Sequence, residues 1–389
     1  MTYQEKQAYY NAIHSRYQRA SRAEKGHILD EYCSVCGYQR KYAIRKLNQV
    51  TSNQPRKKPG RPSRYEQPEL IKALREIWFA TDQMCGKRLV AALPEWLPHY
   101  EKIHPCLAAD VKARLLSASA ATLDRLLKPH RIAGGKGLSG TKPGTLLKNQ
   151  IPVRSGIWDV SVPGFMEADT VAHCGRSLAG DFVWSLTLTD ILTGWTECRA
   201  TWNKGSTGVV KQIKAIEQAL PFPLLGFDCD NGSEFLNYHL LRYFTDHPGQ
   251  PQFTRSRPYK KNDNAHVEQK NWTHVRHLFG YDRLEEVGLV EAMNDLYANE
   301  WSLLQNHFRP TMKLKEKQRI GGRYQKKYEK PETPYARIMA SEAIEATVKK
   351  TLKAQHQQLN PFELKATIEA KLKAIFNHVT VTSNVRQRI

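Results

Sequence analysis

The chain has 389 residues, with 59 lysines and arginines against 38 aspartates and glutamates, giving a formal net charge of +21 at pH 7. This length predicts two to four domains. The positive excess favours a polyanionic partner, nucleic acid first and an anionic membrane surface second. The sequence contains no run of about 18 apolar residues and no apolar secretion signal, so we expect a cytoplasmic protein without a transmembrane helix. Its seven cysteines, an odd number, are expected to be reduced.

Residues 1–50 predict three helices. The capping-box pattern from Ser21 to Glu24 starts the second helix, and Gly37 separates it from a third helix over residues 38–48. The third helix is amphipathic, and its inward positions are Ala43, Ile44 and Leu47. Its outward positions are basic: Arg40, Lys41, Arg45 and Lys46. A helix, a short turn with glycine and a basic helix are typical of a helix-turn-helix DNA-binding domain.

Two alternatives stay open in this first segment. The basic face could be solvated only, on a plain three-helix bundle. Cys33 and Cys36 form a lone CxxC pair, and a zinc site needs four ligands at consistent spacing. We therefore interpret these cysteines as helix-packing residues.

A basic linker over residues 51–66 follows, and its prolines and glycine exclude a helix. Its centre, Pro59-Gly60-Arg61-Pro62, resembles the core of AT-hook minor-groove binders, which makes Lys58 and Arg61 candidate DNA contacts. A solvated basic linker is an equally good interpretation.

Residues 67–129 predict helices again, one of them stopped by Pro94 and the last beginning near Ser119. We interpret this segment as a second helical DNA-binding module, with a structural spacer as the alternative. Residues 130–155 are rich in glycine and contain no acid, which predicts a basic flexible linker.

The central segment, 156–305, predicts an α/β domain. Strands are expected near 164–172, 182–190 and 195–202, followed by a helix over 206–220. A strand over 224–230, a helix over 235–246, a strand near 251–255 and a helix containing Glu268 complete it. This order favours a mixed sheet with helices on both faces.

Three acids of this segment form a candidate metal site. Asp169 lies inside a predicted strand, Asp230 at the mouth of another, and Glu268 on or beside a helical apolar stripe that includes Trp272. We expect Asp169, Asp230 and Glu268 to converge as oxygen ligands of two Mg²⁺ ions. Spacing alone leaves two alternatives, because Glu167 shares a face with Asp169 and Asp228 shares one with Asp230.

The ordered acids in DTVAH, DNGSEF and NAHVEQKN resemble the D,D,E signature of retroviral-integrase-like transposases. The last two acids are separated by 37 residues (268 − 230 − 1), close to the usual spacing of that family. The flanking segments make the chain similar to bacterial insertion-sequence transposases. The resemblance selects Asp169, Asp230 and Glu268 as the catalytic and metal-binding acids, and it implies an RNase H-like fold.

The resemblance implies an enzyme of the D,D,E type, a polynucleotidyl transferase and endonuclease. It would bind the ends of its mobile element and catalyse two-metal-ion DNA cleavage and strand transfer, with Mg²⁺ or, as a substitute, Mn²⁺. The implied partners are double-stranded DNA, both element ends and target, and further copies of the chain, a dimer or higher. The implied location is the bacterial cytoplasm at the nucleoid, with no membrane partner. The alternatives are a degenerate DNA-binding protein and an RNase H-like nuclease without strand transfer.

Basic residues around the Glu268 helix are candidate phosphate contacts, with a solvated surface as the alternative. They are Lys260, Lys261, Lys270 and Arg276. Residues 306–340 form a basic C-terminal segment, interpreted as a phosphate-contacting tail or small β module. Residues 341–389 predict C-terminal amphipathic helices.

Overall fold

A computed structural model describes residues 1–48, 64–105, 107–131, 160–256 and 265–386. The chain divides into two compact units, Met1–Ser63 and Arg64–Ile389. Within the described residues, no helix is both long enough and apolar enough to cross a membrane.

The first unit contains three helices, α1 (Tyr3–Arg19), α2 (Arg22–Cys36) and α3 (Arg40–Leu47). The predicted capping box is confirmed, since the Ser21 side chain accepts from the backbone of Glu24 and the Glu24 side chain from that of Ser21. Gly37 ends α2 with a φ of 67°, a left-handed conformation that favours glycine.

The core of this unit is aromatic and aliphatic, and Cys36 is buried in it, as expected of a packing cysteine. The sequence prediction placed Ile44 inward, but it is exposed. Helix α3 begins two residues later than predicted, and its eight residues bury only Ala43 and Leu47. A helix this short contributes only a narrow stripe of buried side chains to the core.

The second unit opens with four helices: α4 (Pro68–Ala80), α5 (Gly86–Ile103), α6 (Ala109–Ser117) and α7 (Ala120–Leu127), with a short 3-10 turn η1 (Lys128–His130). The prediction that Pro94 ends a helix is wrong, because α5 continues through Pro94 and Pro98. The buried face of α5 outweighs the hydrogen bonds lost at the two prolines. That face includes Leu93, Trp96 and Leu97.

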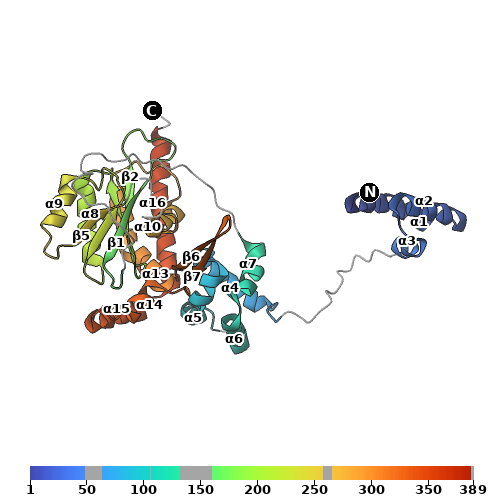
Figure 1. Cartoon of the computed structure of the whole chain (residues 1–389), viewed down its shortest axis with the longest axis horizontal. Coiled ribbons are helices and arrows are strands. Elements are labelled where there is room, and N and C mark those ends of the chain that lie inside the picture. The colour runs from blue at the N-terminus through green and yellow to red at the C-terminus, as the bar shows by residue number, and fades with distance from the viewer. Residues whose placement is uncertain (49–63, 106, 132–159, 257–264, 387–389) are drawn as a thin grey trace. The chain divides into compact units, whose positions relative to one another are not determined.

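These four helices pack on the rest of the second unit and share one hydrophobic core with it. The indole Nε1 of Trp96 donates to the carbonyl of Phe308 at 3.0 Å. The guanidinium of Arg309 donates to the Asp82 carboxylate at 2.5 Å, and the Lys365 amine donates to the same carboxylate at 2.6 Å. Segments more than 200 residues apart in sequence are therefore joined through buried contacts (Figure 1).

A five-stranded mixed sheet forms the centre of the second unit. Its strands are β1 (Phe165–Ala172), β2 (Val183–Asp190), β3 (Thr196–Trp202), β4 (Gly226–Cys229) and β5 (Gln252–Arg255). The spatial order is β3-β2-β1-β4-β5. Strands β1, β2 and β3 pair antiparallel, whereas β4 runs parallel to both β1 and β5. The strand positions predicted from the sequence are confirmed.

Helices cover both faces of the sheet (Figure 1). On one face lie α8 (Ser206–Ala219) and α9 (Tyr238–Thr245), which bury Ile213 and Phe244 against β1, β2 and β4. The opposite face is covered by α10 (Ala265–Lys270), the π-helical turn η2 (Asn271–Arg276), α11 (His277–Phe279), α12 (Leu289–Leu296), the π-helical turn η3 (Tyr297–Trp301) and α13 (Ser302–Phe308). The central domain is an α/β fold with a mixed sheet and helices on both faces, as predicted.

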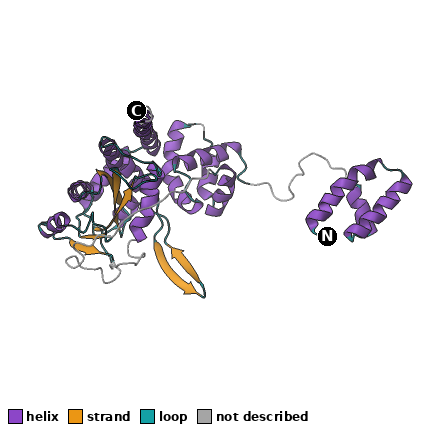
Figure 2. Ribbon diagram, turned by 90° about the horizontal axis from the view of Figure 1, so that it is seen from above, coloured by secondary structure: helices purple, strands orange, loops and turns teal. Residues whose placement is uncertain are grey.

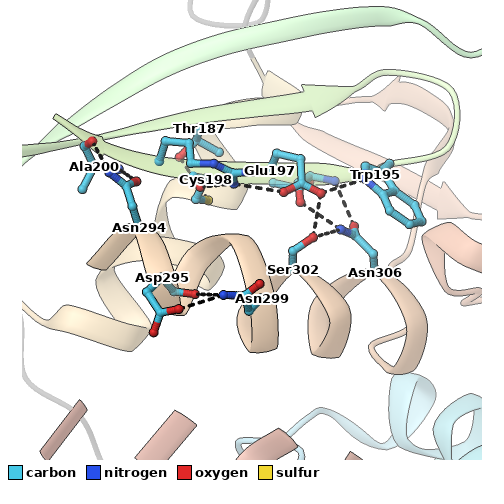
Figure 3. A network of polar contacts seen from close by, with 12 residues as sticks. Thr187, Trp195, Glu197, Cys198, Ala200, Asn294, Asp295, Asn299, Ser302 and Asn306 are labelled. Atoms are coloured by element: carbon cyan, nitrogen blue, oxygen red, sulfur yellow. Dashed lines mark hydrogen bonds and ion pairs between the residues drawn. The ribbon is translucent and has the colours of Figure 1, made fainter. Parts of the chain in front are cut away.

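A buried polar network joins β3 to the helices on the second face (Figure 3). The Glu197 carboxylate accepts from the indole of Trp195 at 3.0 Å and from the hydroxyl of Ser302 at 2.6 Å. The Asn306 amide bridges the backbone of Thr196, accepting from its N–H at 2.9 Å and donating to its carbonyl at 3.0 Å. These bonds fix α13 against the strand, because an unpaired buried amide or carboxylate would be costly.

The C-terminal part contains a two-stranded hairpin and three helices. The hairpin consists of β6 (Leu314–Ile320) and β7 (Arg323–Tyr328), and it lies in the segment where the sequence indicated a tail or small β module. The helices are α14 (Pro334–Ala340), α15 (Ala346–Gln358) and α16 (Pro361–Arg386). Helix α16 buries Ile368 and Ile375 in the core shared with α5 and α12.

Candidate active site

The strand register places four acids on one face of the sheet. Glu167 pairs with Asp228 across the parallel strands β1 and β4, and side chains two residues apart share a face. Asp169 and Asp230 are each two residues further along. Asp169 therefore follows Glu167 on the same face inside β1, and Asp230 comes directly after β4 ends, so both lie just beyond the last pair of the β1–β4 register, Ala168 with Cys229.

Both oxygens of the Asp169 carboxylate accept hydrogen bonds. Its Oδ1 accepts from the backbone N–H of Thr170 at 2.7 Å, and its Oδ2 accepts from the side-chain amide of Asn271 at 2.6 Å. Asn271 begins η2 and comes three residues after Glu268 on the same helical segment. The segment that carries Glu268 is therefore attached to β1 at Asp169 itself.

Glu167 contacts the same segment one turn earlier. Its carboxylate is fully buried and accepts from the backbone N–H of Val267 at 3.3 Å. A carboxylate in this position satisfies one of the amides that the first turn of a helix leaves unpaired. Asp228, also fully buried, accepts from the hydroxyl of Thr254 on β5 at 2.6 Å. The inner pair of acids, Glu167 and Asp228, thus bonds to the neighbouring helix and strand, while the outer pair, Asp169 and Asp230, lies just beyond the last pair of the β1–β4 register.

Asp230 and Glu234 lie close together around the turn after β4. The Asp230 Oδ1 accepts from the N–H of Gly232 at 2.8 Å. A Cβ at Gly232 would lie 2.8 Å from that oxygen and 2.6 Å from the Glu234 carboxyl carbon, so a larger residue there would displace the two carboxylates. Glu234 is buried and accepts from the Thr170 hydroxyl at 2.9 Å, with the Lys204 amine at 3.4 Å.

The pKa of the Asp230 carboxyl is raised to about 6, chiefly by burial and in addition by the nearby Glu234 carboxylate, while the Gly232 N–H opposes the shift. An acid with this pKa ionises more readily when a cation approaches. Glu234 was not among the sequence-predicted site residues. The sequence predicted a helix from residue 235, but α9 begins at Tyr238 and Asn237 caps it.

The backbone of Glu268 lies in α10, and its side chain lies outside the described part of the structure. The predicted apolar stripe needs correction, because Trp272 is 48% exposed whereas Val267 and Val275 are buried. The π-helical turn η2 rotates the residues that follow it relative to a regular helix. A 3.6-residue period therefore does not predict which side chains beyond Lys270 face the sheet.

Lys270 does not lie where a DNA contact was predicted. Its side chain is buried, and its amine donates to the carbonyl of Gly194 in the β2–β3 turn at 3.1 Å. The pKa of this amine is lowered to about 7, chiefly by burial and in addition by the neighbouring Arg88 and Arg337. An amine inside this contact cannot reach a phosphate, so the assignment of Lys270 as a DNA contact is wrong.

Arg276 is also engaged inside the protein. Its guanidinium donates to the carbonyl of Ala172 at 2.9 Å and to that of Gly280 at 3.3 Å, and it lies over the ring of Tyr281 at 4.6 Å. This geometry fixes the end of β1 to the helical segment and does not favour the predicted phosphate contact. Lys260 and Lys261 lie outside the described residues, as do Lys58 and Arg61.

On α3, Arg40, Lys41 and Arg45 are exposed, as a basic outer face requires. Lys46 is only partly exposed, and its amine lies 5.2 Å from the ring centroids of both Tyr10 and Tyr38. Lys46 therefore contributes to packing of the first unit, whereas the other three remain candidates for DNA contact.

Among the described side chains, no three of His, Cys, Asp and Glu converge as a metal site. The two outer carboxylates nevertheless fit the predicted cation. They are hard oxygen donors just beyond the last pair of the β1–β4 register, and oxygen is the donor type that Mg²⁺ prefers. The raised pKa of Asp230 adds a second reason, because a buried acid next to another acid gains from a nearby cation.

The chain is 41% identical over 330 residues to the uncharacterized protein y4rM of Sinorhizobium fredii (strain NBRC 101917 / NGR234), a match that covers 84% of this chain and 93% of y4rM. The chain belongs to the y4rM family. No family model matches this chain.

Solved structures similar to this y4rM-family chain include three of retroviral integrases. The HTLV-2 integrase catalytic core domain in complex with magnesium is 15% identical, covering 39% of this chain and 91% of that chain, with a TM-score of 0.27. The catalytic core domain of BIV integrase is 16% identical, covering 46% and 95%, with a TM-score of 0.29. The simian T-cell lymphotropic virus intasome in complex with PP2A regulatory subunit B56 gamma is 14% identical, covering 54% of this chain and 68% of that chain, with a TM-score of 0.30. At such identities and scores, activity has to be argued from the sheet order and the acids themselves.

Proposed function

We propose that the protein is a DNA transposase of the D,D,E type, which cleaves and joins DNA at an acid site formed by Asp169, Asp230 and Glu268. The single observation that carries the proposal is the hydrogen bond from the Asn271 amide to the Asp169 carboxylate at 2.6 Å. This bond ties the Glu268 segment to β1 at the first acid. The register of β1 and β4, which pairs Ala168 with Cys229 immediately before the first and second acids, supports the proposal.

Asp169, Asp230 and Glu268 would hold the divalent cations. When bound, these ions supply charge stabilisation at the oxygens of the phosphate that is cut. The other residues position the acids. Asn271 orients the Asp169 carboxylate, and the Gly232 N–H orients Asp230.

Glu167 has a different part in the same site. By accepting from the N–H of Val267, it fixes the first turn of the helix that carries Glu268. It is buried beside Asp228, and both residues come two positions before Asp169 and Asp230 in the sequence. We therefore assign Glu167 and Asp228 to support of the site and Asp169 and Asp230 to the metal.

The test is Mg²⁺-dependent nicking and joining of duplex DNA that carries the ends of the element encoding the protein. Wild type is compared with Asp169→Asn, Asp230→Asn and Glu268→Gln. We expect each variant to lose cleavage and joining to background while binding of a labelled end fragment is kept. Asp246→Asn is the matched control, because Asp246 is an exposed acid at the end of α9.

Each other outcome would change the function or the ligands assigned to the protein. Cleavage by wild type without a joined product identifies a nuclease of the same fold, since this fold hosts several chemistries. Tight binding with no cleavage in Mg²⁺ or Mn²⁺ identifies a degenerate DNA-binding protein. Cleavage that survives Asp230→Asn but not Asp228→Asn reverses the assignment of the second ligand.

A further inference from the structure

The β6–β7 hairpin forms a two-stranded ribbon that pairs with no other strand among the described residues. It turns at Gly321, whose φ of 59° favours glycine. All six residues of β7 are exposed. Figure 2 shows the two strands standing clear of the helices of the second unit.

The two faces of this ribbon differ in charge. Tyr324, Lys326 and Tyr328 alternate along β7 and therefore share one face, where Tyr324 pairs with Arg319 of β6. We call this the Tyr324 face. The opposite face carries Glu316, the one acid in the two strands, in an ion pair with Lys327 at 2.8 Å.

The ribbon is poorly suited to stand alone in water. Tyr324 is 59% exposed and Tyr328 45% exposed, and an isolated two-stranded hairpin is at best marginally stable. A polyanion bound along the Tyr324 face would cover the rings.

The base of the ribbon is anchored to the β2–β3 turn through consecutive carbonyls. The Lys313 amine donates to the carbonyl of Leu192 at 2.6 Å, and the Arg337 guanidinium donates to that of Thr193 at 2.9 Å. The next carbonyl, that of Gly194, accepts from Lys270, two residues after Glu268. The ribbon and the Glu268 segment are thus attached to the same turn.

We propose that the Tyr324 face binds a groove of duplex DNA and so sets the position of the duplex relative to the acid site, an inference that rests on the proposed function. Charge complementarity selects DNA, because this face presents Arg319 and Lys326 with no acid between them. The major groove, about 12 Å wide, admits a two-stranded ribbon. The tyrosines supply contact area beside the phosphates that the cations bind.

The experiment compares two double variants of the full chain that remove equal charge from opposite faces. Arg319→Gln with Lys326→Gln alters the Tyr324 face, and Arg323→Gln with Lys327→Gln is the matched control. Binding to a labelled duplex is followed by fluorescence anisotropy from about 50 to 200 mM salt, and two lost phosphate contacts should lower the salt slope by about 2. We expect about a 10-fold or greater loss of affinity for the first variant and a clearly smaller loss for the control.

A photocrosslinking residue placed at Tyr324 or at Gln325 gives a second measurement. Crosslinks to duplex from position 324 but not from position 325 support the proposal, because these neighbours lie on opposite faces. Equal losses in the two double variants, or equal crosslinking from the two positions, would overturn it. So would a change in oligomeric mass without DNA that is confined to the Tyr324-face variant, because that face would then bind a second copy.

Failure of the inference and failure of the proposed function are distinguishable. A wild-type protein that binds duplex through the Tyr324 face but never cleaves retains the ribbon assignment and loses the transposase one. Cleavage that depends on Asp169 but not on the ribbon retains the transposase assignment and loses the ribbon one.

Discussion

The carboxyl of Asp230 lies in an environment that penalises its charge. Burial and Glu234 raise its pKa from 3.8 to about 6. The folded protein therefore holds this proton more tightly than the unfolded chain does. Stability then falls as pH rises from about 4 to about 6, and the full penalty applies above that range.

We expect Asp230→Asn to stabilise the protein at pH 7.5 without divalent cations. The gain has an upper bound of about 3 kcal/mol, since each pKa unit corresponds to about 1.4 kcal/mol. Asn keeps an acceptor for the Gly232 N–H, so the turn is retained. Urea unfolding at pH 7.5 and at pH 4 measures the effect, which should disappear at the lower pH. An Asp230→Asn protein that is less stable than wild type at pH 7.5 would contradict this account.

Asn271 contributes through one hydrogen bond to Asp169. Asn271→Ala should lower the free energy of unfolding by about 1 kcal/mol, the usual contribution of such a bond. It should also raise the Mg²⁺ concentration needed for half-maximal cleavage about 10-fold or more, as loss of a group that orients a metal ligand does. Denaturant titration and a Mg²⁺ titration of cleavage measure the two effects.

Asn299→Ala is the control for this substitution. Asn299 is exposed, and its side-chain amide bonds only to Asp295 among the described contacts. The control should leave the Mg²⁺ requirement unchanged. A similar change in both variants would mean that Asn271 acts on general stability and not on Asp169.

At the scale of elements, local signals in the sequence predicted well. The capping box at Ser21 and the strand around Asp169 involve neighbouring residues only, and both appear in the structure. Pro94 led to a wrong prediction of a helix end, because the buried face of α5 packs against residues of α13 and α16, which are distant in sequence. The burial of Lys270 could not be predicted, since its acceptor Gly194 lies 76 residues away in sequence.

Helix α5 is expected to unfold together with the sheet. Trp96→Ala removes a fully buried indole and its bond to the Phe308 carbonyl. A loss of about 3–5 kcal/mol is expected for such a substitution. Near-ultraviolet and far-ultraviolet circular dichroism should then show one transition at a lower denaturant concentration. A separate early transition limited to part of the helical signal would show that α4–α7 is an independent module.

At the scale of the whole molecule, the two units have separate cores. Calorimetry of the full chain should therefore show two transitions. Removal of residues 1–63 should eliminate one transition and leave the other at the same temperature within about 2 °C, because sites without shared partners are additive. A shift of the remaining transition by more than this would reveal an energetic contact between the units.

The shared core of the second unit also constrains the order of events during synthesis. The acceptor of the Trp96 indole lies 212 residues later in the chain, and a partner of Asp82 lies 283 residues later. At about 5–20 residues per second, translation delivers that last partner roughly 15 to 60 seconds after Asp82 itself. Through that interval the nascent chain presents the apolar side of α5 without its final cover. A ribosome-associated chaperone would find its binding surface there, on helices that the finished protein keeps hidden.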